Sequence, residues 1–206
     1  FRLVVTTAVV AAVAIVVVAG LRRLTRRPSW GHGLAGLTAA VAAAGTYVAV
    51  TATGNAEVDA VERVHLVEYG LLAWGFFLAW RREAGWGSVL MASAASLIVA
   101  AAEGTVQWYV PFRVGELRDV ALDGVAVAAG LLMAVSLDPP VRWGDRMSRR
   151  RRRVAGAMLS VAIVAVAMVL QVAHLGHRID EPGVAVFWSR FTRDDLLRLQ
   201  AHRRAT

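Results

Sequence analysis

Residues 154–175 read VAGAMLSVAIVAVAMVLQVAHL and contain no Asp, Glu, Lys or Arg over 22 positions. A helix needs about 20 largely apolar residues to cross the hydrocarbon core of a bilayer. Five consecutive arginines, residues 149–153, stand directly before this stretch, as is typical of a membrane surface. The stretch therefore predicts a transmembrane helix, and with it an integral membrane protein.

Five further stretches have the length and composition of a membrane span. Together with residues 154–175 they predict an all-α fold, a polytopic bundle of about six transmembrane helices within residues 1–175. A short extracytoplasmic tail, residues 176–206, would follow the bundle. The five further stretches are Leu3–Gly20, Leu34–Thr53, Val64–Trp80, Gly87–Tyr109 and Val120–Leu137.

The overall composition supports the same interpretation. Hydrophobic residues make up 57% of the 206-residue chain, charged residues 18%, and the mean hydropathy is +0.53. Ordinary globular domains have about 45–50% apolar and about 25% charged residues. The chain has no cysteine, which excludes disulfides, thiolate metal sites and cysteine nucleophiles.

The net charge of +8 comes from 23 basic residues, all of them arginine. These arginines cluster between the apolar stretches, where membrane topology and anionic lipid headgroups account for them. No basic face of a soluble fold remains to bind nucleic acid, so we expect membrane lipids, and no nucleic acid, as partners.

The same arginines predict the orientation of the chain. The segments after the first, third and fifth spans carry 4, 2 and 7 arginines, and those after the second and fourth together carry 3. The positive-inside rule then places the odd-numbered segments in the cytoplasm and both termini outside. The longest run has two interpretations, a stop signal that orients the sixth helix or a site for anionic lipid. It comprises Arg149, Arg150, Arg151, Arg152 and Arg153.

Polar residues within the expected spans are the candidates for function. Ionisable side chains inside a membrane cost several kcal/mol and usually face a bundle interior or a wet cavity. Three spans carry polar pairs at helical spacing, all near the outer surface. We expect one outward-opening polar pocket, although hydrogen bonding between helices is an alternative explanation. The pairs are His65 with Glu68, Glu103 with Gln107, and Asp119 with Asp123.

The residue types suggest a role for each side chain if the pocket is catalytic. Glu103, Asp119 and Asp123 are the acid/base candidates, because a carboxylate among others in a low dielectric can exchange protons near neutral pH. Arg113 would hold an anionic group such as a phosphate. His65, Glu68 and Gln107 would bind or orient the ligand.

At these residues the chain resembles the VanZ-like family over about residues 60–135. The family pattern is matched by Glu103-Gly-Thr-Val-Gln107, then Arg113, Asp119, Asp123 and Gly130, and upstream by His65-Leu-Val-Glu68-Tyr69-Gly70. Asp123 stands where the family usually has Asn, and Ala126 stands where its first glycine often is. The resemblance implies a multi-helix protein of the bacterial cytoplasmic membrane. Through the family's namesake it also implies a link to teicoplanin-type glycopeptide resistance, but no known reaction.

Other features of the chain suggest no cofactor. His174 and His177, three residues apart, could bind a metal together with His65 if the helix continued through them, but no metal-binding motif is present, and we expect neither a metal nor a cofactor. In the tail, Thr192 with Asp195 predicts the start of a short amphipathic helix. Residues 184–188 are expected to form an interfacial connector.

Two classes of function remain open from the sequence. The first is a VanZ-like envelope protein whose outer pocket binds a polar or lipid-linked envelope component, with or without catalysis. The second is a non-catalytic accessory subunit of a larger membrane complex, stabilised by the same polar residues. The small residues, the minimal soluble mass and the short amphipathic tail fit the second class.

Overall fold

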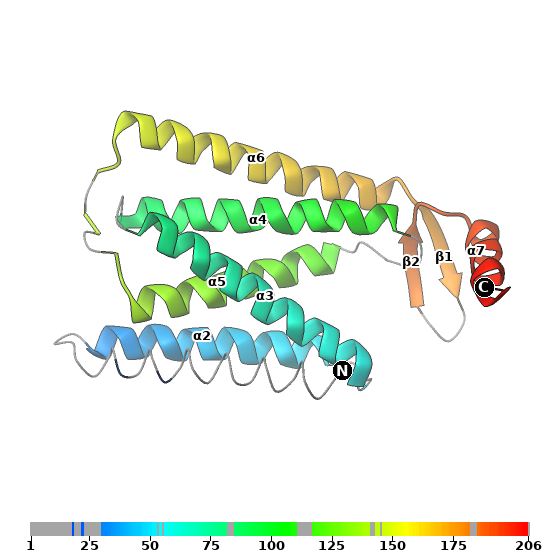
Figure 1. The fold of residues 1–206 in the computed structure, drawn as a ribbon, viewed down its shortest axis with the longest axis horizontal. Helices are drawn as coiled ribbons and strands as arrows, with labels where there is room; N and C mark the ends of the chain where they lie inside the picture. The colour runs from blue at the N-terminus through cyan, green and yellow to red at the C-terminus, as the bar shows by residue number, and fades with distance from the viewer. Residues whose placement is uncertain are drawn as a thin grey trace.

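The computed structural model describes residues 18, 22, 30–52, 54, 56–81, 85–110, 117–140, 143–144, 146–181 and 185–205 (Figure 1). The fold is helical, with one small β-hairpin near the C-terminal end. Its elements are α2 (Trp30–Thr51), α3 (Ala56–Trp80), α4 (Gly85–Tyr109), α5 (Leu117–Leu137), α6 (Arg149–His174), β1 (His177–Glu181), β2 (Ala185–Ser189) and α7 (Arg193–Ala205).

Four of these helices, α2, α4, α5 and α6, are long and apolar enough to cross a membrane. They coincide with four of the six expected spans. The helix α3 is 25 residues long but less apolar, because acidic residues and His65 occupy its first half. It begins about two turns before the expected Val64. The first expected span, Leu3–Gly20, lies outside the described residues except for Val18.

The helices α4 and α5 form the centre of the bundle. In Figure 1, α6, α4, α5 and α2 lie side by side, and α3 crosses obliquely over one face. Contacts agree with this arrangement, because α6 packs on α4, α2 packs on α5, and α3 packs on both central helices. Large side chains such as Val161, Ile163 and Met168 of α6 remain exposed, as expected for a surface that faces lipid.

Small residues bring the helices close together. The buried core combines Tyr47, Tyr69 and Phe77 with many alanines from α3, α4 and α5. At the crossing of α3 and α5, a Cβ atom placed on Gly130 would lie only 2.6 Å from the Cα of Gly70. Membrane helices depend on such close approach because lipid provides no hydrophobic drive for their association.

The tail differs from the sequence prediction in one respect. Residues 184–188 were expected to form an interfacial connector, and no strand was predicted, but Ala185–Ser189 form strand β2, which pairs antiparallel with β1 from His177↔Ser189 to Glu181↔Ala185. Pairing satisfies backbone groups that a connector would leave to water. Gly176 permits the hairpin to meet α4, because a Cβ there would lie 2.8 Å from the carbonyl oxygen of Ser189 and would clash with Trp108.

The predicted start of the tail helix is confirmed. The backbone N–H of Asp195 donates to the Thr192 hydroxyl at 3.2 Å, and the backbone N–H of Thr192 donates to the Asp195 carboxylate, also at 3.2 Å. This reciprocal pattern is a capping box. These hydrogen bonds lower the pKa of Asp195 below its ordinary value, because they favour the charged carboxylate.

Candidate functional site

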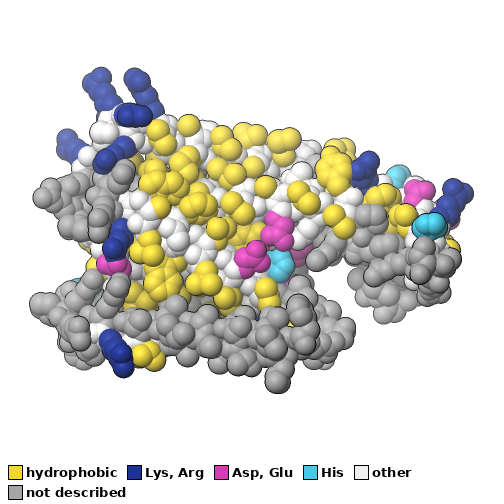
Figure 2. Space-filling view, viewed as in Figure 1, with side chains coloured by type: hydrophobic (Ala, Val, Ile, Leu, Met, Phe, Trp, Pro, Cys, Tyr) yellow, Lys and Arg dark blue, Asp and Glu magenta, His cyan; other side chains and the backbone are white. Residues whose placement is uncertain are grey.

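The polar side chains of three helices meet near the end of the bundle that lies toward the β-hairpin. Asp123 is six residues from the start of α5 and Glu103 is six residues from the end of α4, which corresponds to about 9 Å along each helix. Figure 2 shows acidic and histidine side chains gathered on one face, surrounded by hydrophobic surface. We call His65, Tyr69, Glu103, Gln107 and Asp123 the polar cluster.

Glu103 is the most firmly held member of the polar cluster. The Tyr69 hydroxyl of α3 donates a short hydrogen bond to one of its carboxylate oxygens. The Gln107 amide, one turn further along α4, donates to the other oxygen at 2.8 Å. Tyr69 is 1% exposed. Because each of its oxygens accepts a hydrogen bond, the Glu103 carboxylate is held in place and joins α3 to α4.

His65 and Asp123 form a looser pair between α3 and α5. The Nδ1 atom of His65 lies 4.0 Å from the nearer carboxylate oxygen of Asp123. That distance is longer than the usual 2.7–3.2 Å of a hydrogen bond, so the two atoms do not bond directly, and a water molecule or a ligand atom beside the pair can bridge them. The His65 ring also stacks on Tyr69, with ring centroids 6.2 Å apart, which fixes its orientation.

Asp123 is in an unusual setting for a carboxylate. It is only 8% exposed, and it lies within electrostatic range of Glu103, Asp119, Glu62 and Glu68. Burial and neighbouring negative charge both disfavour the charged form of an acid. A cationic or hydrogen-bond-donating ligand group would relieve both effects.

Tyr47 and Glu62 extend the polar cluster toward α2, and the sequence analysis did not propose them. The Tyr47 hydroxyl donates to a carboxylate oxygen of Glu62 at 3.4 Å, which is long for a hydrogen bond. Tyr47 is 1% exposed. Glu62, His65 and Tyr69 follow one another at i, i+3 and i+7, which places them on one face of α3. That spacing is the signal that could have identified Glu62.

The remaining proposed residues fall into three groups. Asp119 is half-buried one turn before Asp123, and Glu68 is exposed on α3, so both border the polar cluster. Arg113 lies outside the described residues. Arg149, Arg150, Arg151, Arg152 and Arg153 are exposed at the start of α6, at the opposite end of the bundle (Figure 1).

The structure places the two C-terminal histidines in different elements. Helix α6 ends at His174, and His177 begins β1, so the two residues do not share a helical face. The glycine at position 176 ends the helix between them. Among the described residues, no group of three or more His, Asp or Glu side chains could hold a metal ion.

This geometry can bind and orient a polar group and can move a proton. Glu103 is fixed by Tyr69 and Gln107, whereas His65 and Asp123 face each other at 4.0 Å without a direct hydrogen bond. A carboxylate and an imidazole at that separation can act as acid and base on a bound group. Ligand contact is therefore expected at His65 and Asp123, with Glu103 as the fixed neighbour.

Comparison of the chain with models of known protein families, with curated proteins and with solved structures found no match.

Proposed function

We propose that this chain is a six-span, VanZ-like protein of the bacterial cytoplasmic membrane whose outward-facing polar cluster binds a polar or lipid-linked component of the cell envelope. The motif at residues 65–70 and 103–130 supports the family assignment. The family assignment and the count of six spans are both parts of the proposal. In this arrangement Leu3–Gly20 and α3 are the two spans beyond α2, α4, α5 and α6.

The distribution of charge supports the outward orientation. The start of α6, with its arginine run, and the end of α5 lie at one end of the bundle, whereas the polar cluster lies toward the other (Figure 1). The positive-inside rule assigns the arginine end to the cytoplasm. The polar cluster, the hairpin and α7 would then be on or near the extracytoplasmic side.

The observation that carries the proposal is the 4.0 Å separation between His65 and Asp123, beside a Glu103 whose two oxygens each accept a hydrogen bond. Polar groups that only joined the helices would be expected to bond directly to one another, as Tyr69 and Glu103 do. A buried carboxylate that its imidazole neighbour does not bond directly is suited to a ligand that donates hydrogen bonds, such as a sugar hydroxyl, an amide or an amine.

If the bound component reacts, Asp123 and His65 are the groups that would transfer its protons. Asp119 lies one turn away, on the same face of α5, and can take part in the same proton exchange. Glu103 and Tyr69 would position them. Arg113 would hold a phosphate or another anion. Whether the site reacts or only binds is decided by the experiment below.

Asp123→Ala tests the proposal because it removes the carboxyl group, whereas Asn, the usual residue at this position in the VanZ-like family, keeps a polar group there. The full chain, extracted gently from its own membrane, is expected to retain one defined envelope component in native mass spectrometry. In the Asp123→Ala variant we expect retention to fall by about tenfold or more, since the hydrogen bonds to the carboxyl group are lost. Asp194→Ala, on the exposed first turn of α7, is the matched control.

The same measurement separates binding from catalysis. A component retained unchanged by wild type, and lost from Asp123→Ala, means binding alone. A component that accumulates on Asp123→Ala and is converted on wild type means a reaction. Equal retention by wild type, Asp123→Ala and Asp194→Ala would refute the proposal. Expression of the wild-type chain in a glycopeptide-susceptible host should also change teicoplanin susceptibility if the family link holds.

The tail favours a second candidate, an accessory subunit of a membrane complex. The hairpin and α7 lie beyond one end of the bundle (Figure 1), and the guanidinium of Arg190, which follows β2, lies 4.8 Å from the centre of the Tyr109 ring at the end of α4. On α7, Leu197 is 53% exposed, and an exposed leucine on a short amphipathic helix can contact a partner. Stoichiometric protein partners in the mass spectrum would favour this candidate.

A further inference from the structure

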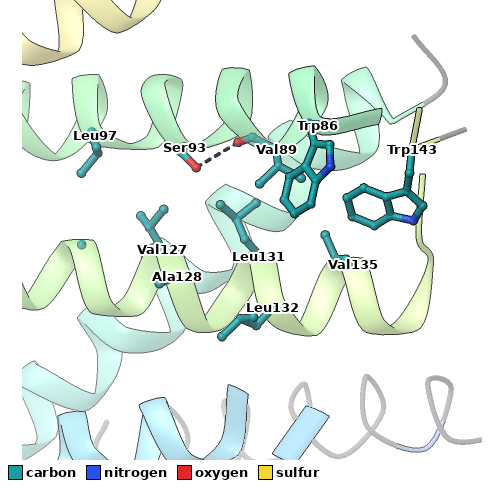
Figure 3. A pocket seen from close by; sticks show the side chains of 11 residues that line it. Trp86, Val89, Ser93, Leu97, Val127, Ala128, Leu131, Leu132, Val135 and Trp143 are labelled. Atoms are coloured by element: carbon teal, nitrogen blue, oxygen red, sulfur yellow. Dashed lines mark hydrogen bonds between the residues drawn. The ribbon is translucent and has the colours of Figure 1, made fainter. Parts of the chain in front are cut away.

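An apolar groove of about 470 Å³ lies between α4 and α5, away from the polar cluster (Figure 3). Its walls are aliphatic, with Val89 and Leu97 from α4 facing Val127 and Leu131 from α5. Ser93 is also present, but its hydroxyl donates to the carbonyl oxygen of Val89 at 2.9 Å. The groove therefore offers a ligand hydrocarbon contact and few polar groups.

The small residues of α5 create the space. Gly124 and Ala128, one turn apart, both line the groove, and a Cβ atom added to Gly124 would meet nothing within 4 Å. In Figure 3 the ribbon of α3 passes behind both helices, and α3 contacts each of them. The groove is thus bounded by α4 and α5 on its sides and lies on their surface away from α3.

Two tryptophans stand at one end of the groove. The rings of Trp86, at the start of α4, and Trp143, in the segment after α5, lie 4.7 Å apart and are tilted by 58°. Trp86 is 69% exposed. Tryptophan is enriched at the level of lipid headgroups, where its ring contacts hydrocarbon and its N–H contacts polar groups. This end of the groove therefore marks the membrane interface.

Positive charge surrounds the same end. Arg146 follows Trp143 by three residues and the exposed run at 149–153 begins three residues later. Figure 2 shows basic side chains at this end of the molecule. The nearby acid Asp138 forms an ion pair with Arg81, so its charge is offset. Anionic headgroups are attracted to such juxtamembrane arginine clusters.

We propose that this groove holds one acyl chain of an anionic phospholipid, with the phosphate of its headgroup beside Trp86, Trp143 and the arginine run. The volume of 470 Å³ is within the usual range of small-molecule sites, about 300–1,000 Å³. A spanning helix, about 10 Å wide and about 30 Å long, is too large to be its occupant. The site is independent of the polar cluster and of the function proposed for it.

Filling the groove tests the proposal. The full chain is reconstituted in bilayers of phosphatidylglycerol and phosphatidylcholine in equal parts, released, and examined by native mass spectrometry. We expect wild type to retain one phosphatidylglycerol in preference to phosphatidylcholine. Ala128→Phe places a ring in the groove and should reduce that retention by about tenfold or more. Ala121→Phe, at an exposed position of α5 that does not line the groove, is the matched control and should retain the lipid.

Two further variants keep the test decisive. Gly124→Val fills the same space with a smaller side chain and should also lose the lipid, even if Ala128→Phe folds poorly. Arg149→Gln with Arg150→Gln should reduce the preference for phosphatidylglycerol over phosphatidylcholine by about fivefold or more, because the charge attraction is weakened.

Three results would overturn the proposal. The first is equal lipid retention by Ala128→Phe, Gly124→Val and Ala121→Phe. The second is retention of phosphatidylcholine as strong as that of phosphatidylglycerol, which would mean ordinary lipid contact. The third is a dimer of the wild-type chain that the Ala128→Phe substitution converts to monomers, which would mean that a second copy of the chain occupies the groove.

Discussion

Glu103 and Asp123 are both carboxylates within the bundle, yet their surroundings give them different roles. Glu103 accepts hydrogen bonds from Tyr69 and Gln107, so its position is fixed. Asp123 lies 4.0 Å from His65, without a direct hydrogen bond to it. Residue type and spacing identify both acids as candidates, but only the neighbours contributed by α3 show that Tyr69 bonds to Glu103 whereas His65 does not bond directly to Asp123.

Asp195 provides a prediction of pH dependence outside the membrane. Its hydrogen bonds with Thr192 lower its pKa in the folded tail. A lowered pKa means that the capping box stabilises α7 above the pKa of an unfolded aspartate, about 3.9, and that this stabilisation is lost as the pH falls through the folded value. We expect the first turn of α7 to fray in acid, as followed by the backbone chemical shifts of Asp195 and Leu196.

The matched comparison for this prediction is Asp195→Asn. An asparagine side chain can still accept hydrogen bonds but does not titrate in this range. Its chemical shifts should therefore remain unchanged over the same acid titration. Identical acid transitions in wild type and Asp195→Asn would assign the fraying to another group.

Among the elements, α3 and α5 cross at a point where glycine lets the two backbones approach closely. Gly70 and Gly130 face each other there, and a Cβ on Gly130 would come within 2.6 Å of the Gly70 Cα. This crossing holds His65 of α3 near Asp123 of α5. The spacing of the polar cluster thus depends on two residues that have no side chain.

Gly130→Ala is expected to destabilise the bundle by about 1–3 kcal/mol, the usual cost of overpacking a close contact. It should also lower the ligand retention proposed for Asp123, because α3 and α5 must move apart. Thermal unfolding in detergent measures the first effect. Gly75→Ala, on α3 with open space around its added Cβ, is the control and should be neutral or stabilising by up to about 1 kcal/mol. Equal melting temperatures of Gly130→Ala and Gly75→Ala would contradict the close packing of α3 on α5.

The whole molecule has a polar end and an arginine end, and their orientation can be measured directly. The chain has no cysteine, so a single introduced cysteine is a unique probe. Gln200→Cys on exposed α7 should react with a membrane-impermeant maleimide in intact spheroplasts. Gly144→Cys, at an exposed position in the segment after α5, should react only after the membrane is permeabilised. The reverse labelling pattern would mean that the arginine end faces outward.

Some parts of this molecule follow from local sequence. The apolar stretches locate α2, α4, α5 and α6 closely, because a span must be long and apolar wherever it packs. Thr192 and Asp195 define the start of α7, since a capping box needs only four consecutive residues. Glu103 and Gln107 bond as their i,i+4 spacing predicts.

Other features required the tertiary structure. The early start of α3 was missed because Glu62 and Arg63 end an apolar stretch without ending a helix. The hairpin was missed because β pairing joins residues as distant as His177 and Ser189. The bond from Tyr69 to Glu103, the His65–Asp123 separation and the α4–α5 groove each involve residues that are far apart in the sequence. Local periodicity indicates which face of its own helix a side chain occupies. Only the packing of the helices decides which other helix that face meets.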